Sequence, residues 1–421
     1  MKKILTSLLN YFAALTLKRF NPQIIGITGS VGKTSTKEAI YCVLKHRMPS
    51  RASIGSYNNE LGLPLTILNS KAPGKSILNW LIIFIKAIFG LVGSQYPKVL
   101  ILEMGADRPG DIKKLLEVVG QIDVAVITDI GISHLENYPN QAALVAEKLS
   151  LISGLKSHGI PVLNKDNENI RAALGTIKNN PITYGLDQSS TLWASDFQLI
   201  RHDDAFGISF KVHHKNTVVP FFIPDTLGLP AVYAALAATG VGLCMGLSLT
   251  STAESLRSYQ GPLGRLRPLK GIKRTWIIDD SYNAAPASTI AAISVLDQIA
   301  IGRKVAAIGD MAELGPKTEE AHRQVAIKLQ ESGVSLVFLV GEKAKIIQDE
   351  LNKRRFSGTV LWFATSDEAR MTVQNKIMEN DTILVKGSQA VRMEKIVKEI
   401  MSDPMNAEAL LVRQSENWLK Q

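Results

Sequence analysis

The chain has 421 residues, of which 46% are apolar and 20% charged; this is the composition of a globular protein and excludes a largely disordered one. The length predicts two or three domains. The two cysteines, Cys42 and Cys244, argue against a disulfide framework and favour a reducing compartment. The net charge of +10 comes from lysines and arginines spread along the chain without an aromatic-interleaved basic tract, which favours a nucleotide or a membrane surface over nucleic acid as the partner.

Two apolar stretches stand out in the first hundred residues. Residues 1–22 predict an amphipathic helix, because Lys18 and Arg19 follow the apolar part and no small-residue cleavage site of a signal peptide is present. Packing of this helix on the domain and anchoring at a membrane surface both stay open. Residues 77–92 are shorter than the roughly 20 residues of a membrane span, so we expect a buried helix, with a membrane-facing patch formed together with 1–20 as the alternative. The expected location is the cytoplasm, with contact to the inner face of the membrane left open.

Short apolar runs that end in polar residues predict buried strands separated by helical segments, which is typical of a parallel sheet wrapped by helices. These runs are 23–29, 99–103, 124–129 and 162–166. Alternating apolar and polar residues over 191–223 predict hairpins at the edge of this sheet, and 229–258 predict a helical segment.

A domain boundary is expected at the Gly-Pro-Leu-Gly segment of residues 261–264, because glycine and proline interrupt the pattern there. Strand and helix signals then alternate again, with strands expected at 276–280, 305–309, 336–341, 360–363 and 383–386. The predicted organisation is an N-terminal helix (1–22), a central α/β domain (23–260) and a smaller C-terminal α/β domain (261–421).

A phosphate-binding loop is the strongest local signal, since a glycine-rich segment lies between a predicted strand and a predicted helix. Backbone N–H groups at a helix start bind anions, and glycine lets the backbone approach a phosphate closely. Lys33 would reach the β- and γ-phosphates, and the Thr34 hydroxyl would bind Mg²⁺. Ile27 replaces the first glycine of the general pattern. The predicted nucleotide-binding residues of this loop are Gly29, Ser30, Val31, Gly32, Lys33, Thr34 and Ser35.

Such a loop indicates a nucleoside triphosphate without separating kinases, motors, switches and ligases. Further segments narrow the choice, and they occur in this order: GITGSVGKTSTKE (26–38), YNNELGLPLTIL (57–68), LEMGADRPGDI (102–112), ITDIGISHLENY (127–138), KLSLI (148–152), GRL (264–266), DDSYNAAP (279–286), GDMAELG (309–315) and VKGS (385–388). Over residues 23–400 they resemble the Mur ligase family, in particular its members that add D-alanyl-D-alanine to UDP-N-acetylmuramoyl-tripeptide. The resemblance implies an α/β fold, with a P-loop central ATPase domain that has a mostly parallel sheet and a C-terminal Rossmann-like α/β domain that closes on it.

The resemblance implies a metal-dependent ATP site in the central domain. Lys33, Glu103, His134 and Lys148 would be catalytic, and Mg²⁺ would be bound by Thr34, Glu103, His134 and Lys148. Lys148 matches a lysine that family members carry as a carbamate formed with CO₂. The alternative interpretation is an ordinary surface lysine. Asn58, Asn59 and Glu60 match a loop expected to face the nucleotide-linked substrate.

In the C-terminal domain the resemblance implies residues for both substrates. Arg265 and Asp280 would hold the ribose and phosphates of ATP, with Asn283 beside them. Lys386, Ser388 and His322 would face the incoming amine. A structural role between domains is the competing explanation for each.

The sequence departs from the family pattern in two places. Residues 1–22 stand where the family has a UDP-binding domain, which we therefore expect to be lacking. The segment from Gly228 has Pro230, Ala231 and Ala234 where the family usually has histidine and asparagines near adenine, so we expect adenine to be recognised by other groups.

The resemblance implies an ATP-dependent amide ligase that forms an acyl phosphate on a peptide carboxylate and passes it to an amine. The expected substrates are a UDP-linked peptide precursor and a D-amino-acid dipeptide, with ATP and Mg²⁺, and the expected state is a monomer. The alternatives are a Mur-type ligase with another acceptor, such as a polyglutamate-forming enzyme, a non-catalytic nucleotide-binding subunit of a membrane-associated complex and, more weakly, a P-loop GTPase switch.

Overall fold

A computed structural model describes residues 2–53, 57–72, 74, 76–131, 135–202 and 205–419. The chain divides into two compact units. Unit 1 consists of Met1–Gln198, Ser209–Ile223 and Leu229–Tyr259. Unit 2 consists of Leu199–Ile208, Pro224–Gly228 and Gln260–Gln421, so two short segments from the sheet edge of the first half belong with the second half of the chain. The domain limits drawn from the sequence stay a prediction.

The sheet of the first half has the strand order β2-β3-β1-β4-β5-β6-β7-β8-β9. Its members are β1 (Gln23–Thr28), β2 (Ser50–Ala52), β3 (Val99–Glu103), β4 (Ile122–Ile127), β5 (Leu155–Asn164), β6 (Ile182–Gly185), β7 (Leu192–His202), β8 (Ala205–His214) and β9 (Thr217–Pro224). Pairing is parallel from β2 through β7. The central strand β1 pairs with β3 on one side and β4 on the other, and this brings the carboxyl ends of three strands to one edge. Ligands of open α/β sheets bind at this edge.

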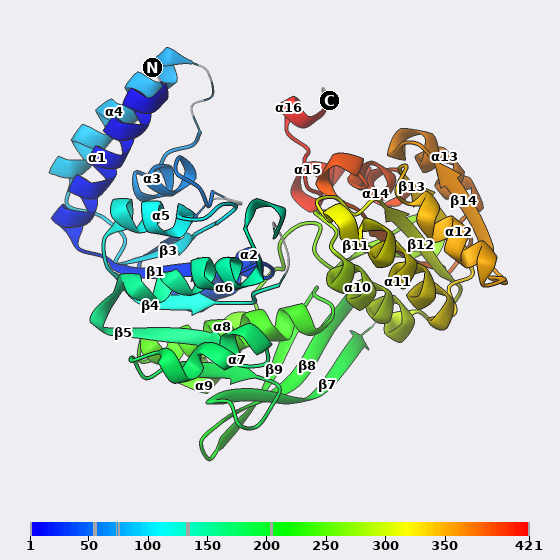
Figure 1. Ribbon diagram of the computed structural model, residues 1–421, viewed down its shortest axis with the longest axis horizontal. Coiled ribbons are helices and arrows are strands. Elements are labelled where there is room, and N and C mark those ends of the chain that lie inside the picture. The colour runs from blue at the N-terminus through cyan, green and yellow to red at the C-terminus, as the bar shows by residue number, and fades with distance from the viewer. Residues whose placement is uncertain are drawn as a thin grey trace. The chain divides into compact units, whose positions relative to one another are not determined.

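Helices cover both faces of this sheet (Figure 1), which is why its central strands are apolar on both sides. The helices are α1 (Lys2–Phe20), α2 (Lys33–Leu44), α3 (Gly62–Ile67), α4 (Ile77–Val92), α5 (Asp111–Val119), α6 (Gln141–Leu149), α7 (Glu168–Ala173), α8 (Leu229–Cys244) and α9 (Leu249–Leu256). α2, α8 and α9 pack together. Apolar residues of α1, α3 and α5 form one core cluster with those of β3 and β4.

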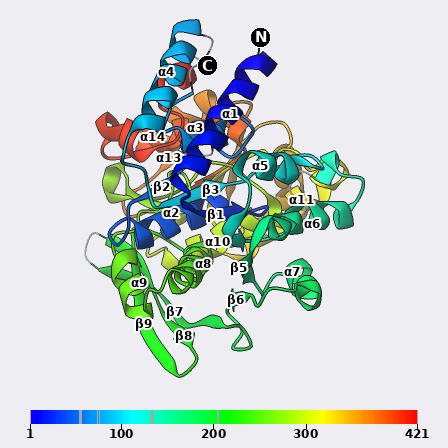
Figure 2. The same cartoon turned by 90° about the vertical axis from the view of Figure 1, so that its left-hand side faces the viewer.

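α1 and α4 lie side by side (Figures 1 and 2), with Phe12 against Phe84 and the Arg19 Nε donating to the Leu91 carbonyl. α1 buries Leu9, Ala13 and Leu17, whereas α4 buries only Ile83 and Ala87. The expectation that 77–92 is a buried helix is therefore wrong, although its limits are correct. Apolar spacing identified the helix, but it carries no information on whether protein covers the second face.

Unit 2 contains a six-stranded sheet of order β10-β11-β15-β12-β13-β14, parallel except for the β10/β11 pair. The strands are β10 (Arg267–Lys270), β11 (Trp276–Asp280), β12 (Lys304–Gly309), β13 (Leu336–Val340), β14 (Thr359–Phe363) and β15 (Thr382–Lys386). The helices are α10 (Pro286–Ile299), α11 (Thr318–Glu331), α12 (Lys345–Lys353), α13 (Ser366–Lys376), α14 (Glu394–Ile400), α15 (Ala407–Leu410) and α16 (Glu416–Leu419). Separate apolar cores form on the two faces, one with α10, α11 and α12 and the other with α13 and α14.

The predicted fold class is confirmed: two mostly parallel α/β sheets follow each other along the chain. The helical segment predicted at 229–258 is two helices, α8 and α9, because the chain turns at Gly246, whose φ is +78°. Among the helices in the described ranges, we find none with the length and apolar character needed to span a membrane.

Candidate active site

The phosphate loop connects β1 to α2 in a conformation that two glycines make possible. Gly32 lies at φ +86°, and a Cβ on Gly29 would come within 2.1 Å of the Thr128 Oγ1. The Ser30 N–H donates to the Asp129 carbonyl at 2.7 Å, which ties the loop to the end of β4. The Lys33 Nζ donates to the Gly29 carbonyl at 2.8 Å, so the ammonium folds back over the loop. This backbone geometry is suited to an anion at the start of α2.

A buried carboxylate lies beside this loop at the end of β3. Glu103 is 1% exposed, and its Oε2 accepts a hydrogen bond from the Thr34 Oγ1 at 3.1 Å. Its Oε1 accepts from the Asn58 Nδ2 at 3.2 Å. The loop and the end of β3 therefore bring together a hydroxyl and a carboxylate, which are oxygen ligands of the kind that Mg²⁺ prefers, and the Asn58 amide N–H₂ holds the carboxylate in place.

Lys148, near the end of α6, is 1% exposed and donates from Nζ to the Ala106 carbonyl at 2.7 Å. Burial, reinforced by the nearby Lys33 ammonium, lowers the pKa of Lys148 from 10.5 to about 8, against the opposing effect of Asp107 and Glu147. A surface lysine is therefore the wrong description of this residue. The lowered pKa increases the fraction of neutral amine, which is the form that reacts with CO₂.

Two of the predicted metal ligands, Thr34 and Glu103, offer the oxygen atoms that Mg²⁺ binds. His134 lies outside the described residues. Within the parts of the chain that the structure describes, no three His, Cys, Asp or Glu side chains gather into a metal-binding cluster. Glu103 and the Thr34 hydroxyl nevertheless suit a cation that uses one or two protein oxygens together with substrate phosphates and water.

The side chains of Asn58, Asn59 and Glu60 have three different partners. Asn58 faces Glu103. The Asn59 Oδ1 accepts from the backbone N–H of Gly62 at 2.9 Å and holds the entrance to α3. Glu60 is exposed, with a carboxylate oxygen 3.5 Å from the Lys114 Nζ. Only Asn58 of the three thus lies against the cluster at the end of β3.

Asp129 and Tyr233 were not among the site residues predicted from the sequence. Asp129 follows β4, and its Oδ1 accepts from the Asn167 Nδ2 at 2.7 Å; burial raises the pKa of Asp129 despite this bond and the charge of Lys33. The segment ITDIG contains Asp129, so a carboxylate after a buried strand was the available signal. In the segment where the family's asparagines are replaced, the Tyr233 hydroxyl donates to the Asp166 Oδ2 at 2.8 Å.

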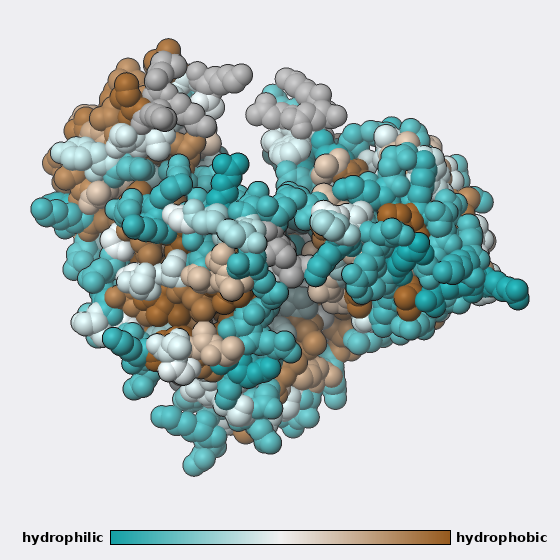
Figure 3. All heavy atoms as spheres, in the orientation of Figure 1, coloured by the Kyte–Doolittle hydropathy of each residue, from teal (hydrophilic) through white to brown (hydrophobic). Residues whose placement is uncertain are grey.

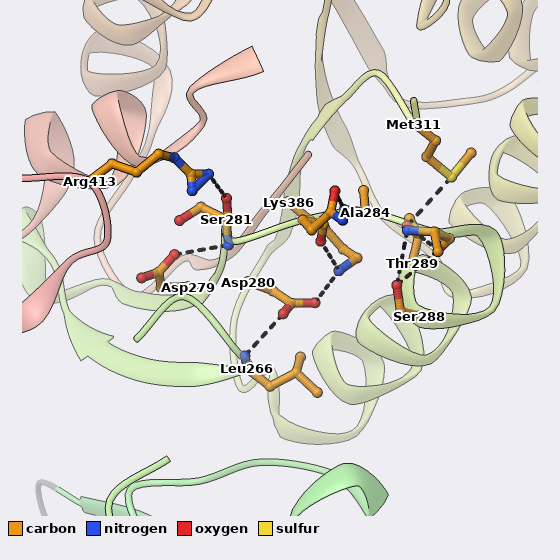
Figure 4. Close-up of polar contacts among 12 residues, drawn as sticks. Leu266, Asp279, Asp280, Ser281, Ala284, Ser288, Thr289, Met311, Lys386 and Arg413 are labelled. Atoms are coloured by element: carbon orange, nitrogen blue, oxygen red, sulfur yellow. Dashed lines mark hydrogen bonds and ion pairs between the residues drawn. The ribbon is translucent and has the colours of Figure 1, made fainter. Parts of the chain in front are cut away.

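In unit 2 a buried ion pair joins the ends of β11 and β15 (Figure 4). The Lys386 Nζ lies 2.6 Å from the Asp280 Oδ2 and also donates to the Asn283 carbonyl at 2.9 Å. The other Asp280 oxygen accepts from the Leu266 N–H at 3.2 Å. Burial raises the pKa of Asp280, and Lys386 and Arg265 counteract this. Lys386, expected to face the amine, and Asp280, expected to hold ATP, are thus paired with each other.

The loop after β11 is held from the C-terminal end of the chain. The Arg413 Nη2 donates to the Ser281 carbonyl at 2.8 Å (Figure 4). It also donates to the Tyr282 carbonyl at 3.1 Å. The Arg265 guanidinium lies 4.2 Å from the centre of the Tyr282 ring, and the Asn283 side chain is exposed. Arg413 was not found from the sequence, because it lies far along the chain in a segment without a motif.

His322 is wholly buried, and the prediction that it faces the amine does not match its surroundings. Its Nε2 accepts from the Met311 N–H at 3.2 Å and its Nδ1 lies 2.7 Å from the Thr318 carbonyl, so the Nδ1 carries the proton. Burial lowers the pKa of His322, which fits this neutral state. Ser388 is also buried, and its Oγ accepts from the Ala312 N–H at 2.7 Å. Both residues position the loop over 310–312.

A P-loop on a parallel sheet, followed by a Rossmann-like unit, defines a nucleotide-dependent α/β enzyme. Comparison with known proteins narrows this class: residues 27–242 match the Mur ligase middle domain, and residues 264–389 match the Mur ligase, glutamate ligase domain. The chain belongs to the Mur ligase family. This is a family of ATP-dependent ligases that form carbon–nitrogen bonds and use Mg²⁺.

Relatives match along nearly the whole chain. UDP-N-acetylmuramoyl-tripeptide--D-alanyl-D-alanine ligase of Bacillus subtilis is 28% identical over 399 residues, which are 94% of this chain and 80% of the relative. The enzyme of the same name from Buchnera aphidicola subsp. Baizongia pistaciae is 30% identical over 91% of this chain and 76% of its own. A crystal structure of MurF from Acinetobacter baumannii superposes with a TM-score of 0.76 at 25% identity, covering 94% of this chain and 80% of that one. MurF of Thermotoga maritima in complex with ADP shares the fold, with a TM-score of 0.77 at 24% identity over 94% of this chain and 83% of that one.

Proposed function

We propose that this chain adds D-alanyl-D-alanine to a UDP-N-acetylmuramoyl-tripeptide in the synthesis of peptidoglycan precursors, with ATP as the energy source. The observation that carries the proposal is the phosphate loop with Thr34 hydrogen-bonded to the buried Glu103, in a chain that aligns over 94% of its length with a relative of that named activity. The C-terminal family match supports a second unit that takes part in the ligation.

The first chemical step proposed is attack of the tripeptide carboxylate on the γ-phosphorus of ATP. An oxygen–phosphorus bond forms, the bond to the β,γ-bridging oxygen breaks, and ADP leaves. Because two anions must approach each other, the site has to supply positive charge and alignment. Lys33 supplies one ammonium at the loop. Bound Mg²⁺ would be held by Thr34 and Glu103 and would neutralise charge on the phosphates.

We propose that Lys148 works as a carbamate. Its neutral amine attacks the carbon of CO₂, a nitrogen–carbon bond forms, and a proton is released, which leaves an anion on the side chain. The Lys33 ammonium repels a charged Lys148, as its contribution to the lowered pKa of Lys148 indicates. A carbamate at Lys148 is negatively charged, so the Lys33 ammonium would attract it. The buried position limits competition from water. The carbamate would add an oxygen ligand for Mg²⁺, together with His134.

In the second step the amine of the dipeptide attacks the acyl carbon. A carbon–nitrogen bond forms through a tetrahedral intermediate, and phosphate leaves with the oxygen that came from the carboxylate. For unit 2 we propose that Arg265, Asp280 and Asn283 contact ATP, and that Lys386 organises this loop through Asp280 and the Asn283 carbonyl. Ser388 and His322 hold the adjacent loop.

The proposed location is the cytoplasm, where ATP is available, and the two cysteines are free as a reducing compartment requires. Contact with the inner face of the membrane is a separate proposal, which rests on α1 and α4.

The test is release of ADP by the purified chain with Mg-ATP, UDP-N-acetylmuramoyl-tripeptide and D-alanyl-D-alanine, leaving out one substrate at a time. We expect release that needs both substrates, together with a pentapeptide product identified by its mass. Release with glutamate in place of the dipeptide would instead support a polyglutamate-forming enzyme. ATP binding without turnover under any of these conditions would support the non-catalytic subunit.

A further inference from the structure

An apolar stripe runs along the exposed surface of α4 from one end of the helix to the other. Its exposed large apolar residues follow helical spacing and are Ile77, Leu78, Leu81, Ile82, Ile85, Ile88, Phe89 and Val92. Ile77 and Phe89 are each 72% exposed and Val92 is 81% exposed, so these side chains lie in solvent rather than at the rim of a core. Because Ile83 and Ala87 face the opposite way, the exposed stripe is a second apolar face of one helix.

α1 extends this surface. Ile4, Leu8 and Tyr11 are exposed at helical spacing on the side of α1 away from Leu9 and Ala13. Phe12 packs on Phe84 of the neighbouring helix. Figure 3 shows apolar side chains gathered over α1 and α4, whereas much of the remaining visible surface is hydrophilic. We call the exposed apolar residues of these two helices the α1/α4 face. A contiguous apolar surface of this kind marks an interaction site.

Charge indicates what the partner is. Neither α1 nor α4 contains an aspartate or a glutamate, while α1 contains Lys2, Lys3, Lys18 and Arg19 and α4 contains Lys86. Lys86 is exposed and lies between the apolar stripe and the packed side of α4, where its long side chain can reach away from the apolar surface. Two copies of the chain joined through this face would bring lysines toward lysines, which is unfavourable. An anionic surface is complementary to it.

The size and residue types also fit lipid. α4 has 16 residues and is about 24 Å long at 1.5 Å per residue, which is shorter than the roughly 30 Å hydrocarbon core that a spanning helix must cross. Tyr11 is exposed and Trp80 is partly buried, and both residue types favour the boundary between lipid and water. Large apolar side chains bordered by basic residues are the pattern of a helix that inserts its apolar face below the headgroups.

We propose that the α1/α4 face docks this chain on an anionic phospholipid membrane, with the exposed stripe of α4 in contact with acyl chains and the basic residues in contact with headgroups. This inference goes beyond the ligase reaction and does not depend on it. The membrane would then hold the enzyme at the surface without a spanning segment.

The test is co-sedimentation of the full chain with vesicles of phosphatidylcholine, with and without phosphatidylglycerol. We expect the protein to sediment with the mixed vesicles and to be released by high salt in part, because salt screens the headgroup contacts. A variant with Ile82→Ser, Ile85→Ser and Phe89→Ser should bind at least about tenfold more weakly, because three large apolar side chains no longer leave water. Lys86→Glu should weaken binding about fivefold or more on the mixed vesicles and little on phosphatidylcholine alone.

The matched control is Val218→Ser with Ile301→Ser and Met405→Ser, which removes three exposed apolar side chains outside the α1/α4 face and should leave binding unchanged. If the triple variant of α4 fails to fold, Lys86→Glu tests the proposal alone. Failure of the unmodified chain to sediment, or equal binding by the α4 and control variants, would overturn the proposal. A lipid-free dimer in analytical ultracentrifugation that Phe89→Ser abolishes would overturn it too, since a second copy would then cover the face.

Discussion

Lys148 in unit 1 and Lys386 in unit 2 are both almost fully buried, yet their surroundings differ. The Lys386 ammonium lies 2.6 Å from the Asp280 carboxylate. Lys148 donates to a backbone carbonyl, and among the described residues no carboxylate comes within ion-pair distance of it. Burial of a charge is unfavourable unless a partner offsets it. The Asp280 partner offsets it for Lys386, whereas for Lys148 the pKa falls to about 8.

A buried lysine with a carboxylate partner is structural, whereas one without such a partner is available for chemistry. The paired ammonium of Lys386 holds two strand ends together. An unpaired one is partly neutral near physiological pH and is nucleophilic. Lys33 increases the contrast, since its charge contributes to the lowered pKa of Lys148.

The largest effect is expected for Lys33→Ala. The variant should lose at least about 1,000-fold in ATP-dependent ligation, because the loop no longer supplies an ammonium to the phosphates. The circular dichroism spectrum and the thermal midpoint should stay close to those of the unmodified chain. Activity near that of the unmodified chain would remove the phosphate-loop assignment.

Lys148→Ala should lose about 100-fold in ligation, and small carboxylates such as formate or acetate should restore part of it. The matched variant Lys148→Arg keeps a cation but cannot form a carbamate, so the same carboxylates should not restore its activity. Addition of bicarbonate alone should rescue Lys148→Ala poorly. Unchanged activity in Lys148→Ala would contradict the carbamate role.

For the free energy of unfolding we expect the larger loss at Lys386 and not at Lys148. Lys386→Met leaves the Asp280 carboxylate buried without its partner and should reduce the free energy of unfolding by about 3–5 kcal/mol. Lys148→Met removes an unpaired buried cation and should cause no loss. Urea denaturation measures both. Equal losses would mean that the two sites are alike, and adding Asp280→Asn to Lys386→Met should recover much of the loss.

The pH dependence of Lys148 follows from its lowered pKa. Below about pH 8 both the folded and the unfolded chain bind this proton, and the unfavourable burial of the charge is fully present. Between about 8 and 10.5 only the unfolded chain binds it, so this residue makes folding more favourable as pH rises. At fixed dissolved CO₂, the carbamate signal in ¹³C NMR should increase through pH 8. A signal that does not change with pH would contradict the lowered pKa.

The smallest effect is expected at the loop with Asn58 and Glu60. Asn58→Ala removes the amide that bonds to Glu103 and should lower ligation about tenfold. Glu60→Gln changes an exposed residue paired with the exposed Lys114 and should alter ligation little. Initial rates at saturating ATP separate the two variants. An equal loss in both would place Glu60 at the substrate after all.

Much of the fold could be predicted because buried parallel strands are continuous apolar runs. β3 (VLILE) is such a strand, and its position was found from the sequence. The phosphate loop was found because its chemistry is local, within residues 29–35. The sequence left open whether α4 is buried or exposed, because an apolar helix has the same pattern whether protein, lipid or water covers it.

Contacts between distant residues could not be predicted from local patterns. Asp280 and Lys386 were both singled out, but their pairing joins residues 106 positions apart and depends on β11 lying beside β15. His322 was expected to face the amine, whereas burial and two backbone contacts make it a support for the loop over 310–312. Arg413 carried no signal, since its role depends on where the C-terminal segment returns to the loop after β11.

In the proposed reaction, phosphoryl transfer from ATP activates the carboxylate of the peptide. The decisive experiment uses UDP-N-acetylmuramoyl-tripeptide labelled with ¹⁸O in its reacting carboxylate, together with ATP and D-alanyl-D-alanine. We expect one ¹⁸O atom in each inorganic phosphate released, because the acyl carbon–oxygen bond breaks when the amine attacks. Phosphate without ¹⁸O, formed alongside the peptide product or without it, would contradict an acyl phosphate.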